Sequence, residues 1–161
     1  MKSSSFILGG TAVACVGAVA FAVASQSLFK MQPCAWCILQ RVICLAIAVA
    51  CVIGLIWRGT RGRVVCSAVT LLLAMSGMAA ALWQHFQAAS QFSCTRSLAE
   101  RIIQTLQLED LWPRVFAIRA SCADAVASLL GVPYDFWSLA LFAAVAVASI
   151  RVMQRAWPEM P

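Results

Sequence analysis

Charged side chains are what this sequence has least of. Only 11% of its 161 residues are charged, whereas soluble domains average about 25%. Hydrophobic residues make up 63%, well above the roughly 45–50% of soluble domains. This composition excludes an ordinary soluble domain and indicates an integral membrane protein.

Four apolar stretches are long enough to cross a bilayer, which takes about 20 mainly apolar residues in a helix. They cover roughly residues 6–25, 38–57, 64–83 and 136–153. No repeat, low-complexity tract or charge block divides the chain, so we expect one integral membrane domain over residues 1–161. The predicted fold is all-α, a four-helix transmembrane bundle.

The net charge of +6 is concentrated in short segments beside the apolar stretches, which favours a membrane surface over nucleic acid as the partner. These segments contain Lys2, the run "RGTRGR" at 58–63, and Arg151 with Arg155. The positive-inside rule places them in the cytoplasm, with both termini. A first outward segment at 26–37 and a second outward segment at 84–135 then face the other side.

The start of the chain has a second interpretation. Lys2, an apolar stretch and "AVAS" at 22–25 imitate a secretory signal with an A-x-A cleavage site. The apolar stretch continues almost to Phe29 and exceeds the usual 7–15 residues of a signal core, which favours an uncleaved helix. Both alternatives leave the same topology.

The eight cysteines divide into two groups of four in this topology. Those within the apolar stretches behave as small hydrophobic residues, and we expect them to serve packing. They are Cys15, Cys44, Cys51 and Cys66. The others lie in outward segments, in a compartment where disulfides persist, and are either structural or redox-active pairs. They are Cys34, Cys37, Cys94 and Cys122.

The position of "PCAWCILQR", residues 33–41, favours redox chemistry for the first pair. Pro33 is typical of a chain about to enter a helix, which places Cys37 in the first helical turn. The helix dipole there favours an anion such as a thiolate. Arg41 follows on the same face, where an ionisable group at membrane depth indicates function, unless it only snorkels to the headgroups.

A CxxC disulfide that oxidises other thiols needs an electron acceptor, and missing motifs exclude several. Ile38 replaces the histidine of a c-type haem motif, no G-x-G-x-x-G is present, and the second pair lacks zinc-site spacing. A lipid-soluble quinone remains, whose developing negative charge Arg41 would stabilise. The only histidine, His85, is either a hydrogen-bond donor there or an ordinary interfacial residue.

The second outward segment contains a predicted short amphipathic helix after Cys94. It begins with a capping-box pattern and continues with apolar residues at helical spacing. These residues are Ser97 and Glu100, then Leu98, Ile102 and Leu106. The helix either covers the bundle or lies flat on the membrane, where it would keep the second cysteine pair near the CxxC for disulfide exchange.

Together these features resemble the DsbB family, bacterial inner-membrane proteins that re-oxidise the periplasmic thiol oxidase DsbA at the expense of quinone. The resemblance covers essentially the whole chain. It rests on "PCAWCILQR" opening the second membrane helix, Cys94 and Cys122 in the second outward segment, "QH" at 84–85, and "GVPYDFW" at 131–137. Gln40 departs from the family pattern, in which an acidic residue often precedes the arginine.

The resemblance implies a role for each cysteine. Reduced DsbA would attack Cys94, and Cys122 would carry the exchange to the first pair. Cys34 would receive it, which leaves Cys37 as the thiolate that meets ubiquinone or menaquinone. Arg41 would bind the quinone, and His85 is a second candidate quinone ligand. Both outward segments would be periplasmic.

Other interpretations stay open. A DsbB paralogue with its own thiol partner has the same pattern, whereas the vitamin K epoxide reductase type has its loop pair before the CxxC. A soft-metal membrane carrier would use thiolates as ligands, with Cys37, Cys44 and Cys51 along one helix face. In a non-catalytic bundle the pairs would contribute only stability.

Overall fold

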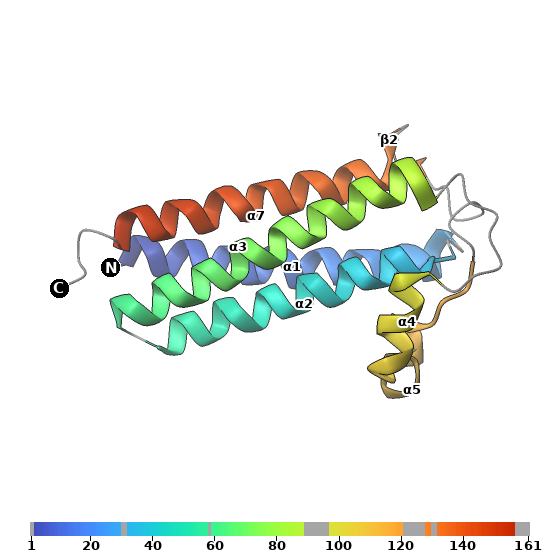
Figure 1. Cartoon of the computed structure of the whole chain (residues 1–161), viewed down its shortest axis with the longest axis horizontal. Helices are drawn as coiled ribbons and strands as arrows, with labels where there is room; N and C mark the ends of the chain where they lie inside the picture. The colour runs from blue at the N-terminus through green and yellow to red at the C-terminus, as the bar shows by residue number, and fades with distance from the viewer. Residues whose placement is uncertain are drawn as a thin grey trace.

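The computed structural model describes residues 2–29, 32–57, 59–88, 97–120, 128–129 and 132–156. Four long helices run side by side along the length of the molecule (Figure 1). They are α1 (Lys2–Phe29), α2 (Ala35–Ile56), α3 (Thr60–Trp83) and α7 (Tyr134–Ala156). Each is long and apolar enough to cross a membrane. This confirms the predicted four-helix bundle.

The helices begin before the apolar stretches that predicted them. In α2 the helix starts at Ala35 and not near residue 38, and α1 continues to Phe29. The first outward segment is therefore shorter than expected, since helical hydrogen bonding extends into the polar residues beside an apolar stretch. Gln26, expected in a loop, lies within α1 and reaches the candidate site described below.

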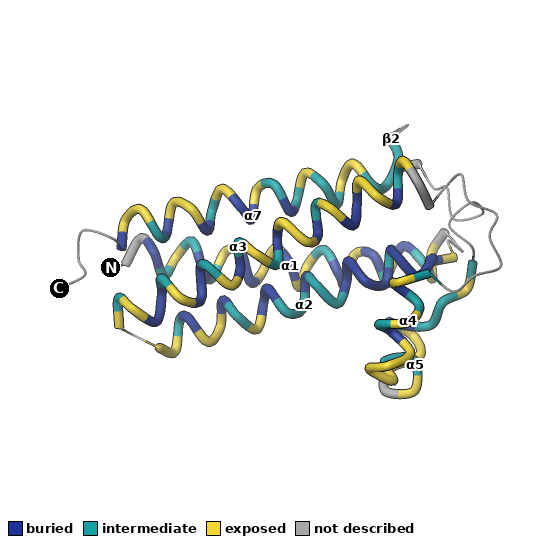
Figure 2. Tube along the Cα trace, in the orientation of Figure 1, coloured by how far each residue is buried: buried dark blue, intermediate teal, exposed yellow. Residues whose placement is uncertain are grey.

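The inner faces of the four helices form the core, and their outer faces are exposed (Figure 2). The four cysteines of the apolar stretches are buried, with exposed fractions of 6% or less, in agreement with a packing role. They are Cys15, Cys44, Cys51 and Cys66. Small residues let membrane helices approach closely. A Cβ added to Gly77 of α3 would lie 2.5 Å from the Phe142 ring of α7.

The described part of the second outward segment contains short elements. After α3 come a π-helical turn, η1 (Gln84–Ala88), then α4 (Leu98–Thr105), α5 (Leu108–Leu111) and α6 (Pro113–Phe116). β1 (Ser128–Leu129) and β2 (Val132–Pro133) form a small antiparallel pair before α7, which the all-α prediction did not include.

Helix α4 confirms the predicted capping box and the short amphipathic helix, but the predicted apolar residues Leu98 and Leu106 are exposed, because the helix turns its neighbouring face toward the bundle. Ser97 Oγ accepts a hydrogen bond from the Glu100 backbone N–H at 3.2 Å, and the Glu100 carboxylate accepts one from the Ser97 N–H at 3.2 Å. Ala99 and Ile103 are fully buried in a cluster that includes Cys34, while Leu98 is exposed. The helix therefore covers the end of the bundle at which α2 begins (Figure 1).

Candidate active site

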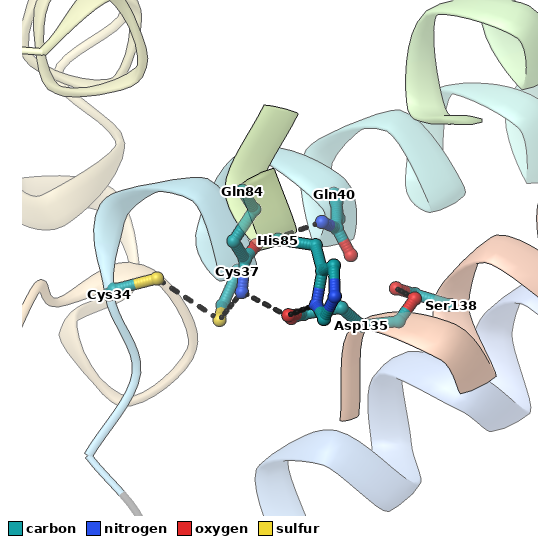
Figure 3. Close-up of polar contacts among 7 residues, drawn as sticks. All are labelled: Cys34, Cys37, Gln40, Gln84, His85, Asp135 and Ser138. Atoms are coloured by element: carbon teal, nitrogen blue, oxygen red, sulfur yellow. Dashed lines mark hydrogen bonds and ion pairs between the residues drawn. The ribbon is translucent and has the colours of Figure 1, made fainter. Parts of the chain in front are cut away.

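The CxxC pair lies where α2 begins. Cys34 is the N-cap residue and is fully buried, and Cys37 lies half-buried in the first turn, as the sequence predicted. The two sulfur atoms are 3.2 Å apart and in hydrogen-bond contact (Figure 3). A disulfide has an S–S bond of about 2.05 Å, so a small shift of these side chains joins them. The geometry suits a pair that opens and closes.

The second outward segment packs over Cys34. The backbone N–H of Arg119 donates to the Pro33 carbonyl over 3.1 Å, which holds this part of the segment against the entry to α2. Phe116 of α6 and Ile103 of α4 belong to the same buried cluster as Cys34. The described part of this segment therefore shields one sulfur of the pair.

Cys37 takes part in a polar network made by three helices (Figure 3). Gln84 Nε2 donates to the Cys37 sulfur over 3.3 Å and to Asp135 Oδ1 over 2.6 Å. Gln40 Nε2 donates to Gln84 Oε1 over 3.0 Å. Gln84 belongs to η1, and a π-helical turn at the end of a helix is frequent at functional sites.

His85 follows Gln84 in η1 and lies beside Asp135. Its Nδ1 is 3.6 Å from Asp135 Oδ2, and its ring packs edge-on against Phe136, with centroids 4.8 Å apart. One Asp135 oxygen therefore faces Gln84 and the other faces His85 (Figure 3). The carboxylate connects the amide that contacts Cys37 with the single histidine of the sequence.

Arg41 is buried, with only 7% of its surface exposed, and it does not snorkel outward. Its Nη1 donates to the Val115 carbonyl of α6 over 3.0 Å. When the Gln26 amide is oriented with its oxygen toward the guanidinium, it accepts from Nη1 and Nη2 at 3.0 Å each. The guanidinium is thus held by α1 and α6 as well as by its own helix.

A cavity of about 370 Å³ opens beside these residues between α1, α2 and α7. Most of its lining is apolar, as is usual in pockets for small organic ligands, which have a few polar groups that orient the ligand. Here those groups include Cys37, Gln40 and Arg41. An aromatic ring in this cavity would meet a thiol and a guanidinium together.

The structure brings together three of the predicted site residues, Cys34, Cys37 and Arg41. His85 does not line this cavity. Its polar contact in the described part of the chain is with Asp135. The predicted second pair, Cys94 and Cys122, lies outside the described residues.

Sequence reasoning assigned no role to Gln84 or Asp135. Both residues lie in motifs that carry the family resemblance, Gln84 in "QH" and Asp135 in "GVPYDFW". An acid in the first turn of a membrane helix was the available signal, because ionisable groups there are costly unless they serve a purpose.

The whole chain is also similar to known proteins. A family model described as "Disulfide bond formation protein DsbB" matches residues 4–152. Disulfide bond formation protein B of Aromatoleum aromaticum is 33% identical, over 96% of this chain and 94% of its own length. Disulfide bond formation protein B 1 of Pseudomonas savastanoi pv. phaseolicola is 33% identical over 84% of this chain and 80% of its own. Disulfide bond formation protein B of Chromobacterium violaceum is 30% identical over 89% of each.

Proposed function

The chain belongs to the DsbB family of disulfide bond formation proteins, and from this we propose that it re-oxidises a periplasmic DsbA-like thiol oxidase and passes the electrons to a membrane quinone. As a member of this family with four membrane-spanning helices, it is a multi-pass membrane protein and a disulfide-forming oxidoreductase. The quinone and the partner are the proposed parts.

The observation that carries the proposal is the cavity that Cys37 and Arg41 line together. Its volume of about 370 Å³ falls within the roughly 300–1,000 Å³ range of small-molecule pockets. Its walls come from helices long and apolar enough to cross a membrane, which suits an acceptor dissolved in the bilayer. Bound ubiquinone or menaquinone would supply a two-electron acceptor. Arg41 would hold a quinone oxygen, and its fixed positive charge would stabilise negative charge there.

The proposed electron route uses disulfide exchange. By the family resemblance, the reduced partner attacks the Cys94–Cys122 disulfide, and the thiolate of Cys122 then attacks the Cys34 sulfur. The Cys34–Cys37 bond breaks, and its electron pair leaves on Cys37, beside the cavity. In the complete reaction the partner dithiol becomes a disulfide, the quinone becomes a quinol, and two electrons and two protons pass between them.

The proposed location is the bacterial inner membrane, with both termini cytoplasmic and the CxxC at the periplasmic surface. The support is the charge distribution, since Arg61 lies in the first turn of α3, and Arg151 and Arg155 lie in the last turns of α7, at the bundle end away from the CxxC (Figure 1). Basic residues collect on the cytoplasmic side of membrane proteins.

The test is quinone consumption by the purified full chain in lipid nanodiscs, with a reduced DsbA-like protein as the electron donor. We expect loss of quinone absorbance in step with loss of partner thiols, one quinone per two thiols. Cys37→Ser should abolish this reaction, whereas Cys51→Ser, a change of a buried core thiol, should retain it in protein that folds. Partner oxidation without any quinone loss would refute the proposed acceptor.

A further inference from the structure

The amide of Gln84 has every hydrogen-bonding group engaged by a different residue. A glutamine amide has two N–H donors and one carbonyl acceptor. The N–H groups go to the Cys37 sulfur and to Asp135 Oδ1, and the carbonyl accepts from Gln40 (Figure 3). Cys37 and Gln40 belong to α2 and Asp135 belongs to α7, so the amide joins two membrane helices at the CxxC.

The contact with Asp135 decides which way the Gln84 amide faces. An ionised carboxylate accepts hydrogen bonds and donates none, so it faces the NH₂ group and excludes the carbonyl. The 2.6 Å bond is the shortest of the three contacts, as expected for a charged acceptor. In this orientation the second N–H of the Gln84 amide points at the Cys37 sulfur, and the carbonyl oxygen of the amide points away from it.

We propose that Gln84 is a further catalytic residue, which donates an N–H to the Cys37 sulfur as that sulfur gains negative charge, and that Asp135 is a positioning residue that fixes the Gln84 amide for this task. The proposal rests on the role of Cys37 in the proposed function. When the Cys34–Cys37 bond breaks, the electron pair goes to Cys37, and a hydrogen bond to this anion is stronger than one to a neutral thiol.

This arrangement separates two negative groups. Within the described ranges, the charged or titratable side chains near Cys37 are Cys34 and Arg41 around the start of α2 and Tyr134 of α7. Asp135 of α7 and His85 of η1 lie beyond the Gln84 amide. Because the Gln84 amide bonds to both the sulfur and the Asp135 carboxylate, each anion meets an N–H. Gln40 supplies no charge in this site but holds the amide oxygen.

The experiment measures how readily Cys37 reacts as a thiolate. The fully reduced full chain, in nanodiscs, is treated with iodoacetamide, and mass spectrometry with fragment ions follows alkylation of Cys37 separately from Cys34. The rate at pH 7 is divided by the plateau rate at high pH, which removes differences in access. We expect Gln84→Leu to lower this ratio by about tenfold, as loss of one hydrogen bond to a charged group implies. Asp135→Asn should lower it by a smaller factor, because loss of the Asp135 charge also relieves repulsion of the thiolate.

Matched variants control for the chemistry of each substitution. Gln154→Leu changes an exposed glutamine near the end of α7, and Asp110→Asn changes an exposed aspartate of α5. Both should keep the wild-type ratio. The double variant of Gln84→Leu with Asp135→Asn should be no lower than Gln84→Leu alone, because Asp135 acts through Gln84.

An unchanged ratio in Gln84→Leu would overturn the whole proposal, and an unchanged ratio in Asp135→Asn would overturn the positioning role. If Asp135→Asn does not fold, Asp135→Glu is tested instead. The glutamate keeps a carboxylate beside the Gln84 amide, so this variant should keep the ratio within about twofold of wild type. A ratio as low as that of Gln84→Leu would then count against the proposal. The assay uses neither quinone nor partner, so a protein that consumes no quinone can still support this inference. Equally, a protein that consumes quinone can fail this assay, which would leave the proposed function standing.

Discussion

Arg41 Nη1 donates a hydrogen bond of 3.0 Å to the backbone carbonyl of Val115, 74 residues later in the chain. The bond joins the second membrane helix to the outward segment that covers the CxxC. The same guanidinium lines the cavity beside Cys37. One buried side chain therefore connects the proposed quinone site with the segment through which a protein partner would act.

Arg41→Ala should lower kcat/KM for quinone by about tenfold to a hundredfold, because it removes a charged hydrogen-bond donor worth about 1.5–3 kcal/mol. Arg41→Lys should recover part of this loss, since a lysine keeps the charge but not the forked geometry. Arg151→Ala, an exposed cation at the other end of the bundle, is the control. Quinone titrations in nanodiscs give the values. An Arg41→Ala protein with the wild-type kcat/KM would contradict the assignment.

Cys122→Ser should accumulate a covalent, reductant-sensitive adduct between Cys94 and a periplasmic thiol protein. The attacked cysteine would then have no loop partner to carry the exchange onward, so the mixed disulfide persists. Non-reducing gels of cells that carry the variant measure the adduct, and Cys94→Ser with Cys122→Ser is the control that should lack it. Normal disulfide formation in the compartment without an adduct would count against the proposed relay.

Gly77→Ala should destabilise the bundle by about 1–3 kcal/mol, the usual cost of an overpacked core position. The new methyl group would lie 2.5 Å from the Phe142 ring, which is itself fully buried. Gly17→Ala is the matched control, because nothing lies within 4 Å of the corresponding Cβ position in α1. Thermal unfolding in detergent compares the two. Equal midpoints would show that α3 and α7 separate here at little cost.

The sequence allowed prediction of the features that depend on local pattern. The four membrane helices follow from long apolar stretches, and the Ser97–Glu100 capping box follows from two residues three positions apart. The first-turn position of Cys37 follows from Pro33. Each depends on neighbours in the chain, so a single sequence is enough to find it.

The polar network around Cys37 could not be found in this way. Gln84 reaches the sulfur from a π-helical turn after α3, and Asp135 comes from the first turn of α7, 51 residues beyond Gln84. No local pattern states that these two helix ends meet. Gln26 was assigned to a loop because the apolar stretch ends before it, although helical structure continues to Phe29 and the side chain reaches Arg41.

Cys34 should react with iodoacetamide more slowly than Cys37 in the reduced chain, because Cys34 is fully buried beneath the outward segment and Cys37 is only half-buried. Reaction at Cys34 then depends on local opening of that segment, whose free energy sets the open fraction. Phe116 is buried in the same cluster, and truncating a buried phenylalanine costs about 3–5 kcal/mol.

Phe116→Ala should therefore raise the alkylation rate of Cys34 by at least about tenfold, since each 1.4 kcal/mol lost from the closed state gives a factor of about ten in the open fraction. Trp112→Ala is the control, because Trp112 is 61% exposed in the same segment and its loss should leave the rate unchanged. Mass spectrometry of the peptide that contains both cysteines, with fragment ions to separate them, measures each rate. If Phe116→Ala leaves the Cys34 rate unchanged, the described segment does not control access to this sulfur, and disulfide exchange reaches Cys34 by another route.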